Sequence, residues 1–530
     1  FNVALLSHEA TACIGTMIDT SAVAEPDGLH AAIAESLDAT LDAAARAPTR
    51  PGSSPPMRRD HRPERLTSLD SAFLRVETAS FPMHIGGVMV LDGGPLRDAQ
   101  GALRIDAIRD HVEARLARTP RFLRRLQEVP FGQGRPLWVD DPDFDIAHHV
   151  KVTTIPSPGG REELFATCSE LNMEVLDRSR PLWELWFVDG LQDGSVGLLQ
   201  KVHHALLDGV SSVEFVTTLF DMEPVHEPER PIRLPCPAPP GAAALIADAW
   251  LERLRDPTAV LRDAGRQLRR APGDAVGGVT DTVGAIAAWL GPSGRAPTSS
   301  LNRPVGRHRR LVSTSMTLAE IGQVREALGG SPNDVALAVL TGGLRSWFAD
   351  HHEPLAELHA MVPVSMRADA TRQGGNVVGS MTIALPLAED DPVRRLGTIA
   401  ERTTRAKRAH QGAAVAATLA AFDHVPPMVP GVVGSALRSF VANQRYVNLV
   451  VTNVPGSPLP LSLLGAEATS ITPVVPLGPN TALGVALLSH VDTMVFGLHA
   501  DPDLCPDVDR LVEEIRAAAD ELLAAARRAA

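Results

Sequence analysis

The 530-residue chain has few cysteines, no long apolar run and no excess of basic residues, and each shortage excludes a class of protein. No stretch approaches the roughly 18 uninterrupted apolar residues of a membrane-spanning helix, so any membrane contact is expected to be peripheral. The formal net charge of −13 offers no basic surface for phosphates, which argues against nucleic-acid binding. The cysteines form no CxxC pair, so neither a zinc site nor a disulfide framework is expected, and a reducing cytoplasm is favoured: Cys13, Cys168, Cys236 and Cys505.

What the chain does have is the composition and patterning of a large α/β protein. An apolar fraction of 44% and a charged fraction of 21% are typical of a soluble globular enzyme. After residue 66 the apolar pattern predicts alternating elements: a helix capped by Thr67 or Ser68, a strand over 84–94, a helix over 104–118, a strand over 148–156, a helix over 161–176 and a hairpin over 182–205. A Pro-rich and basic crossover over 223–310 follows, and the alternation resumes at 311. Two α/β subdomains, 66–222 and 311–530, are therefore expected.

An internal repeat joins the two ends of the chain. FNVALLSHEATACIGTMID at 1–19 aligns without gaps to LGVALLSHVDTMVFGLHAD at 483–501, and further identities continue at the same offset of 482 positions. Two unrelated strand–helix units would also give the apolar pattern, but not the sustained register. Residues 1–47 are therefore interpreted as the closing strand–helix piece of an upstream homologous domain, and the Pro/Arg/Ser-rich residues 48–65 as a linker.

The stretch KVHHALLDGVSS, 201–212, places two histidines and an aspartate among apolar and small residues. Successive side chains of a strand point to opposite faces, so only one of His203 and His204 can enter a given pocket. A metal site is disfavoured because no third ligand has a matching spacing. Two hydrogen-bonded core histidines are the structural alternative. In the catalytic interpretation one imidazole removes a proton from an acceptor hydroxyl.

The motifs that the sequence lacks limit the reactions that such a base could catalyse. A serine hydrolase would need a GxSxG elbow at a strand–helix turn, and none is present. Because no nucleophilic side chain is identified, the pattern indicates that a group passes directly from one bound substrate to the other. The histidine would activate the acceptor.

Several motifs together carry a family resemblance. HHALLDG (203–209) fits the HHxxxDG signature of the CoA-dependent acyltransferase superfamily, which includes chloramphenicol acetyltransferase and peptide-synthetase condensation domains. LTSLDSAFL, PMHIGG (82–87), LDRSRPLWELWFVDGL (176–191), SPNDVALAVLTGGLR (331–345), VPVSMR (362–367) and VTNVPGSPLPLSLLGA (451–466) go further. Over essentially all of 66–530, the chain resembles the bacterial wax ester synthase/diacylglycerol acyltransferase family.

The resemblance implies a fold and roles for the signature residues. The expected fold is α/β, with two chloramphenicol-acetyltransferase-like subdomains, each a mixed β-sheet flanked by helices, and an active-site tunnel between them. His204 would be the general base, and His203 would support its loop. Asp208, followed by Gly209, would act structurally by pairing with an arginine, for which Arg367, Arg309 and Arg310 remain alternatives.

Other family motifs have an ordinary structural explanation beside the functional one. Pro181 and Trp183 match the family's PLW element, and either packing or a place in the tunnel wall explains them. Asn333 and Asp334 match its ND element, but Ser331, Pro332 and Asp334 also make a good helix start. Thr452 and Asn453 end an apolar strand before a Pro-Gly turn, where they either face the tunnel or form the turn. The pair His148–His149 lacks a following Asp-Gly and is interpreted as non-catalytic.

The implied reaction is transfer of a long acyl chain from acyl-CoA, as substrate, to diacylglycerol or a fatty alcohol, with no metal and no permanently bound cofactor. The enzyme would work peripherally at the inner membrane or at lipid droplets, with no nucleic-acid partner. Two alternatives stay open: the same chemistry on a short alcohol, a glycolipid or a polyketide product, and a non-catalytic lipid-binding module.

Overall fold

The structure is a computed structural model, and it describes residues 2–8, 11–17, 63–116, 118–132, 134–207, 215–222, 239–255, 295–365, 378–408, 438–439 and 441–529. The chain divides into two compact units, Phe1–Asp60 and His61–Ala530. In the first unit, strand β1 (Asn2–His8) pairs antiparallel with β2 (Thr11–Met17).

The two copies of the internal repeat form hairpins with the same register. In the first copy Asn2 pairs with Met17. In the second copy, β16 (Leu483–His490) and β17 (Thr493–Ala500) pair Gly484 with His499, which are the residues 482 positions further on. This agreement supports the proposal of a repeat over these two hairpins, and the boundary proposed at residue 47 lies outside the described residues.

The first large sheet of the second unit has six strands in the order β14-β15-β4-β9-β8-β7. The expected hairpin is present: β8 (Trp183–Asp189) pairs antiparallel with β9 (Val196–His203), which pairs antiparallel with β4 (His84–Leu91). At one edge β7 (Val150–Thr154) runs parallel to β8, so the sheet is mixed. The other edge is formed by β15 (Ala466–Val474) and β14 (Ser462–Leu463).

Both faces of this sheet are covered, because apolar residues point to both sides of β4 and β9. Val88 and Leu199 belong to a buried cluster with α4 (Arg161–Met173). Their strand neighbours Met89 and Leu198 belong to the main cluster with α3 (Ile105–Leu116). The near-continuous apolar run of β9, buried along its whole length, is the sequence signature of such a two-sided strand.

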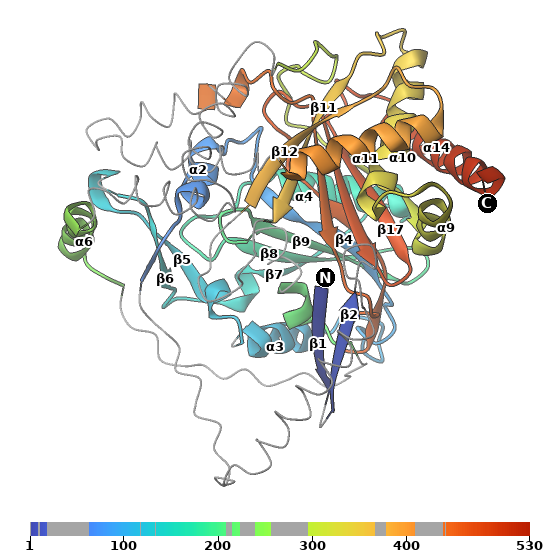
Figure 1. The fold of residues 1–530 in the computed structure, drawn as a ribbon. Helices are drawn as coiled ribbons and strands as arrows, with labels where there is room; N and C mark the ends of the chain where they lie inside the picture. The colour runs from blue at the N-terminus through green and yellow to red at the C-terminus, as the bar shows by residue number, and fades with distance from the viewer. Residues whose placement is uncertain are drawn as a thin grey trace, which may run out of the picture. The chain divides into compact units, whose positions relative to one another are not determined.

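The second large sheet is also mixed, with the order β10-β17-β16-β13-β11-β12. Its remaining strands are β10 (Arg310–Thr317), β13 (Leu449–Pro455), β11 (Leu358–Ser365) and β12 (Val378–Leu385), and β13 runs parallel to both β11 and β16. Four helices share one buried cluster with this sheet (Figure 1): α9 (Leu318–Leu328), α10 (Pro332–Asp350), α11 (Pro392–Arg408) and α14 (Val508–Ala529).

Strand β15 connects the two halves of the second unit, which are the parts built around the first and the second large sheet. It follows β13 in the chain and precedes β16, both of which are in the second sheet, yet it pairs with β4 of the first sheet. The local sequence pattern does not predict this strand. AEATSITPV carries threonines, a serine and a glutamate among its apolar residues, and its long-range partner is invisible to a local pattern.

A small third sheet and short helices complete the first half. Its order is β3-β6-β5, from β3 (Glu64–Arg65), β6 (Leu137–Asp140) and β5 (Arg124–Gln127). Three 3-10 turns accompany it: η1 (Pro120–Leu123), η2 (Pro130–Gly132) and η3 (Ile146–His148). Helix α2 (Ser68–Val76) is capped by Thr67, as expected, and α6 (Ala242–Arg255) lies in the crossover segment.

One detail of the expected strand over 148–156 was wrong. The strand begins at Val150, because Asp145 caps the 3-10 turn that ends at His148 by accepting from the N–H of Ala147. The pair His148–His149 therefore precedes the strand and does not lie on it.

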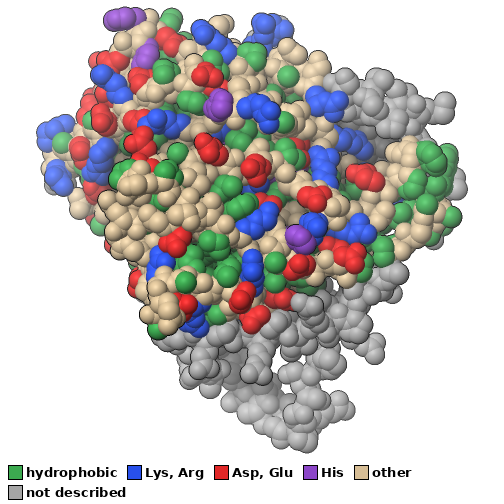
Figure 2. Space-filling view, turned by 180° about the vertical axis from the view of Figure 1, so that it is seen from behind, with side chains coloured by type: hydrophobic (Ala, Val, Ile, Leu, Met, Phe, Trp, Pro, Cys, Tyr) green, Lys and Arg blue, Asp and Glu red, His purple; other side chains and the backbone are tan. Residues whose placement is uncertain are grey.

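The distribution of charged side chains on the surface is consistent with the negative net charge of the chain. Figure 2 shows acidic and basic side chains interspersed over one face, without a continuous basic stripe across it. Within the described part of the chain, no helix has the length and apolarity needed to cross a membrane.

Candidate active site

The two signature histidines lie at the end of β9 in different environments. His203 is the last residue of the strand and is fully buried, whereas His204 begins a turn and is half-buried. The turn is closed by the N–H of Leu206, which donates to the His203 carbonyl at 2.8 Å. The N–H of His204 donates to the carbonyl of Met83, just before β4, at 2.7 Å. Of the two residues, His204 is the more exposed.

The His203 ring is held by contacts on both nitrogens. The N–H of Ala205 donates to Nδ1 at 2.9 Å, so the neutral ring carries its proton on Nε2. Nε2 faces Oε1 of Glu77 at 3.3 Å. This arrangement fixes the tautomer and the orientation of the His203 ring.

Glu77 receives contacts from three separate segments. It is the C-cap residue of α2, and its side chain is 2% exposed. Besides His203, the N–H of Met83 donates to Oε1 at 3.0 Å, and Nη2 of Arg178 donates to Oε2 at 2.9 Å. Burial raises the pKa of this carboxyl, but the hydrogen bonds and the charge of its neighbours outweigh burial and lower the pKa to about 2. Glu77 is therefore an anion at neutral pH.

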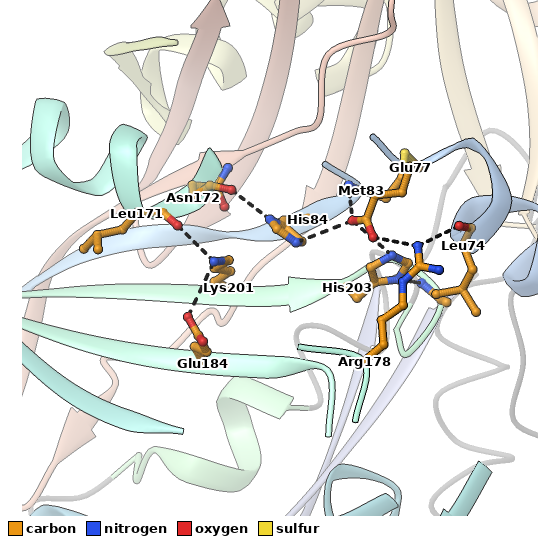
Figure 3. A network of polar contacts seen from close by, with 11 residues as sticks. Leu74, Glu77, Met83, His84, Leu171, Asn172, Arg178, Glu184, Lys201 and His203 are labelled. Atoms are coloured by element: carbon orange, nitrogen blue, oxygen red, sulfur yellow. Dashed lines mark hydrogen bonds and ion pairs between the residues drawn. The ribbon is translucent and has the colours of Figure 1, made fainter. Parts of the chain in front are cut away.

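A second buried histidine, His84, faces the same carboxylate (Figure 3). Its Nδ1 donates to the carbonyl of Asn172 at 2.8 Å, and its Nε2 lies 3.6 Å from Oε1 of Glu77. Burial, followed by the charges of Lys201 and His203, lowers the pKa of His84 to about 3. His84 pairs with His203 across β4 and β9, so both rings project from the same face of the sheet.

Lys201, two residues before His203 on β9, belongs to a neighbouring charged cluster. Its Nζ donates to the carbonyl of Leu171 at 2.9 Å and lies 3.5 Å from Oε2 of Glu184. The Glu184 carboxylate also accepts from Lys151 at 2.7 Å. Glu184 thus ion-pairs with both lysines, and the hydrogen bonds and ion pairs of this cluster reach neither signature histidine.

The ring of His204 lies against an aromatic side chain of α2. Its centroid is 4.4 Å from that of Phe73, with an interplanar angle of 31°. Phe73 itself packs on a small buried cluster that contains Val76, Phe81 and Met83. The ring of this half-buried histidine therefore packs on an apolar surface.

Trp183 and Pro181 are core residues. Trp183 is fully buried; its Nε1 donates to the carbonyl of Phe122 at 2.8 Å, and its ring stacks on His149 at 4.5 Å. His149 in turn bonds the Trp183 carbonyl through Nδ1 at 2.8 Å. Pro181 is buried just before β8. These contacts are sufficient to explain both residues by packing.

The structure brings Asn333 and Asn453 together. Asn333 lies in the first turn of α10 and Asn453 on β13, and Nδ2 of Asn453 donates to Oδ1 of Asn333 at 3.2 Å. Asp334, by contrast, completes a capping box with Ser331 and accepts from Oγ1 of Thr403 at 2.6 Å. Thr452 is half-buried beside Asn453.

Asp208, Gly209 and Arg367 lie outside the described residues. Of the other arginines considered as partners of Asp208, Arg309 donates to the carbonyl of Ser80 at 2.7 Å and lies 3.9 Å from Asp501. Arg310 is 2.8 Å from Asp509.

Two further features bear on ligands. A cavity of about 50 Å³ lies at the junction of the two halves, lined by residues of β4 and β9 and by the segment after β13, including Gly87, Gln200 and Gly456. Among the residues that the structure describes, no group of three or more histidine, cysteine or carboxylate side chains is arranged to hold a metal ion.

Sequence reasoning did not assign roles to Glu77, His84 and Arg178. Each of these residues lies in or beside a motif of the family resemblance, but Arg178 and Glu77 are 101 residues apart in the chain. The available signal for Glu77 was its position, directly after an apolar helix and five residues before PMHIGG. A local pattern could not reveal which residues it contacts.

Two family models match successive parts of the second unit. The family model for the wax ester synthase/diacylglycerol acyltransferase catalytic domain matches residues 66–336, and that for the WS/DGAT C-terminal domain matches 374–523. The chain is 32% identical over 480 residues to the probable diacylglycerol O-acyltransferase tgs1 of Mycobacterium tuberculosis, covering 87% of this chain and 96% of that protein.

Solved structures share the fold. The wax ester synthase/diacylglycerol acyltransferase of Marinobacter aquaeolei VT8 matches with a TM-score of 0.62 and 26% identity, over 87% of this chain and 99% of that chain. The first condensation domain of the CDA synthetase matches with a TM-score of 0.54 and 15% identity, over 87% and 96% of the two chains.

The fold is thus that of the chloramphenicol-acetyltransferase-like proteins, with two subdomains that each contain a mixed sheet flanked by helices. Within that class, the chain belongs to the wax ester synthase/diacylglycerol acyltransferase family of acyltransferases. The predictions of fold and family are confirmed.

Proposed function

We propose that this protein transfers a long-chain acyl group from acyl-CoA to the hydroxyl of diacylglycerol, and also to long-chain alcohols, with His204 as the general base. Family membership supports the reaction class. The observation that carries the choice of base is the contrast at the end of β9: His203 is buried and tied to Glu77, whereas His204 is half-buried and lies against Phe73.

The proposed chemistry proceeds in one transfer without an acyl-enzyme. His204 takes the proton of the acceptor hydroxyl as the oxygen attacks the thioester carbonyl, and a tetrahedral oxyanion forms. Collapse breaks the carbon–sulfur bond, the ester is released, and the CoA thiolate takes the proton from His204. General-base assistance of this kind contributes roughly 10²- to 10⁴-fold to the rate.

Other residues would supply binding and polarity. We place Asn333 and Asn453, whose side chains are hydrogen-bonded to each other, on the wall of a tunnel between the subdomains, where amide donors would stabilise the oxyanion or the acceptor. Thr452 lies next to this pair. Asp208 and Gly209 would fix the turn after His204, with Arg367 as one candidate partner of Asp208.

The acceptor resides in lipid, so the enzyme would work in peripheral contact with the inner membrane or a lipid droplet. Amphiphilic substrates of this kind partition into such surfaces, and an enzyme that uses them gains from binding there. Flotation of the purified protein with vesicles that contain diacylglycerol tests this placement, and protein that remains at the bottom of the gradient contradicts it.

Release of CoA from palmitoyl-CoA, measured in parallel with dioleoylglycerol, hexadecanol and a short alcohol, tests the proposed acceptor. Dioleoylglycerol is expected to give the highest kcat/KM and hexadecanol measurable turnover. A preference for the short alcohol would favour the same chemistry on another acceptor. Absence of turnover with all three would favour a lipid-binding module.

The base is tested by His204→Ala. Turnover of palmitoyl-CoA with dioleoylglycerol is expected to fall about 10²-fold or more. His148→Ala is the matched control, since His148 is an exposed member of the other histidine pair. Wild-type turnover in His204→Ala would refute the assignment.

A further inference from the structure

We propose that Glu77 is a positioning residue for His204, holding the end of β9 in the geometry that the transfer needs. This inference rests on the proposed function, in which His204 is the base. Glu77 itself touches no substrate in this account. It acts through three neighbours of His204: the backbone of Met83, the helix that carries Phe73, and the side chain of His203.

The first connection runs through the backbone of Met83. The N–H of Met83 donates to Glu77 at 3.0 Å, and the carbonyl of Met83 accepts from the N–H of His204 at 2.7 Å. One residue thus transmits the position of the carboxylate to the backbone of the base. Short hydrogen bonds on both sides of a single residue leave little freedom for the turn.

The second connection runs through α2 to the ring of His204. Glu77 ends this helix, and its N–H donates to the carbonyl of Phe73, the residue whose ring lies on His204. Arg178 strengthens the same junction, because its Nη2 donates both to Glu77 and to the carbonyl of Leu74 at 2.7 Å. Through Arg178, the carboxylate is therefore linked to the same helix end that carries the aromatic surface against which the base rests.

The third connection is to His203, the sequence neighbour of the base. The Nε2 proton of His203 faces Glu77, while its Nδ1 accepts from the N–H of Ala205 in the turn. Rotation of His203 would break both contacts and move the turn. Three connections thus lead from the carboxylate and the backbone of one residue to His204, and Figure 3 shows the carboxylate at the centre of its contacts.

The charge of Glu77 matters in addition to its shape. Three groups face it: Arg178 from the loop before β8, His84 from β4 and His203 from β9. Glu77 contacts Met83 and His203, which adjoin His204, and an anion placed there favours the imidazolium that forms when the base takes the acceptor's proton. A residue that only filled space would not affect the pH at which the base becomes protonated.

Glu77→Gln tests the proposal, because it removes the charge and keeps the shape. With activity expressed per folded molecule, kcat with palmitoyl-CoA and dioleoylglycerol is expected to fall about 10- to 100-fold. KM for palmitoyl-CoA is expected to stay within about threefold of wild type. Glu184→Gln is the matched control: Glu184 is half-buried and ion-paired, but in the cluster whose contacts reach neither signature histidine, so kcat should be retained.

The pH profile separates positioning of the base from loss of structure. With the anion gone, the acid limb of kcat/KM is expected to move to lower pH by about 0.5 to 1 unit, because the imidazolium loses a stabilising charge. A profile that is lowered uniformly without a shift would overturn the proposal, and so would a kcat within about twofold of wild type.

Glu77→Asp keeps the experiment decisive if Glu77→Gln does not fold. It retains the charge but shortens the reach to His203 and Met83, so kcat should fall while the acid limb stays in place. An unchanged kcat would contradict the proposal. Loss of activity in His204→Ala together with full activity in the Glu77 variants would reject this inference alone, whereas full activity in His204→Ala would reject the proposed function.

Discussion

At the scale of single residues, the end of β9 gives two neighbouring histidines different environments. The strand ends at His203, which keeps the buried surroundings of the strand, and the turn that follows brings His204 into partial contact with solvent. Polar contacts then fix the tautomer of the first ring and leave the second against an aromatic side chain. One tandem pair thus contains a buried, oriented ring and a more exposed neighbour, as the proposed division into a support and a base requires.

Asn333 and Asp334 are also neighbours with different roles, and mutation should separate them. Asp334→Ala removes the acceptor of Ser331 and Thr403 and should lower the free energy of unfolding by about 2 kcal/mol. Asn333→Ala should lower kcat severalfold and change stability little. Urea unfolding and CoA-release kinetics on both variants check this, and the reverse pattern would show that the amide is structural and the carboxylate functional.

The residues of the site could be predicted only as far as they share a short motif. His203 and His204 stand out because two adjacent titratable rings precede Asp-Gly in an apolar stretch. Glu77 and Arg178 could not be found in this way, because their contact joins segments 101 residues apart. The choice between His203 and His204 from the sequence depended on the resemblance, and strand alternation alone left it open.

At the scale of elements, β4 carries a glycine that its neighbour strand requires. A Cβ on Gly86 would lie 1.9 Å from the carbonyl oxygen of Gln200 on β9, and the residue has a φ of 154°. The close approach keeps β4 and β9 in register at the level of Lys201, and therefore of His84 and His203. The first glycine of PMHIGG thus has a packing function beside the site.

Gly86→Ala should consequently lower the free energy of unfolding by about 3 kcal/mol or more, because backbone atoms must move. Gly322→Ala in α9 is the control: nothing lies within 4 Å of the added carbon, and alanine should stabilise the helix by up to about 1 kcal/mol. Thermal unfolding of both variants measures the contrast. Equal stability of the two would contradict the register argument.

Elements with local signals could be predicted from the sequence, whereas those fixed by distant partners could not. The caps Thr67 and Ser331, the hairpin of β8 and β9 and the apolar strands of the second sheet follow from short patterns. Strand β15 mixes polar and apolar residues and gains its place only by pairing with β4, more than 370 residues earlier. Such pairing is decided by tertiary packing and not by local propensity.

At the scale of the whole second unit, β15 makes the two halves depend on each other. It pairs with β4 of the first sheet, while the strands before and after it in the chain lie in the second. Further bonds cross the same junction: Arg161 donates to Ser313 at 2.6 Å, and Arg309 to the carbonyl of Ser80 at 2.7 Å.

We therefore expect residues 61–530 to unfold in one cooperative transition. If one half melted alone, β4 would lose its edge partner and the apolar faces around it would be exposed. Differential scanning calorimetry of the full chain should show a single main heat-absorption peak for these residues. Two well-separated peaks of comparable area would contradict this expectation.

Buried histidines make the stability of the unit sensitive to mild acid. Burial lowers the pKa of His84 to about 3, and those of His149 and His499 to about 4. Because the unfolded chain takes up protons near pH 6.5 and the folded rings do not, stability is lost as the pH falls below that value.

Between pH 7.5 and 5.5 each of these rings should reduce the free energy of unfolding by about 1 kcal/mol. Urea titrations at the two pH values measure the sum. His499→Asn, whose amide can still donate to the Val475 carbonyl that His499 bonds at 2.8 Å, should show a smaller difference. Equal stability of the wild type at both pH values would refute the assignment of neutral buried rings.

The most direct test of the account is chemical rescue of the base. His204→Gly is assayed for CoA release from palmitoyl-CoA with dioleoylglycerol, with and without added imidazole. The account predicts a loss of about 10²-fold or more, and a partial recovery that grows with the concentration of imidazole free base. Turnover near the wild-type rate without imidazole would contradict the claim that this ring removes the proton of the acceptor.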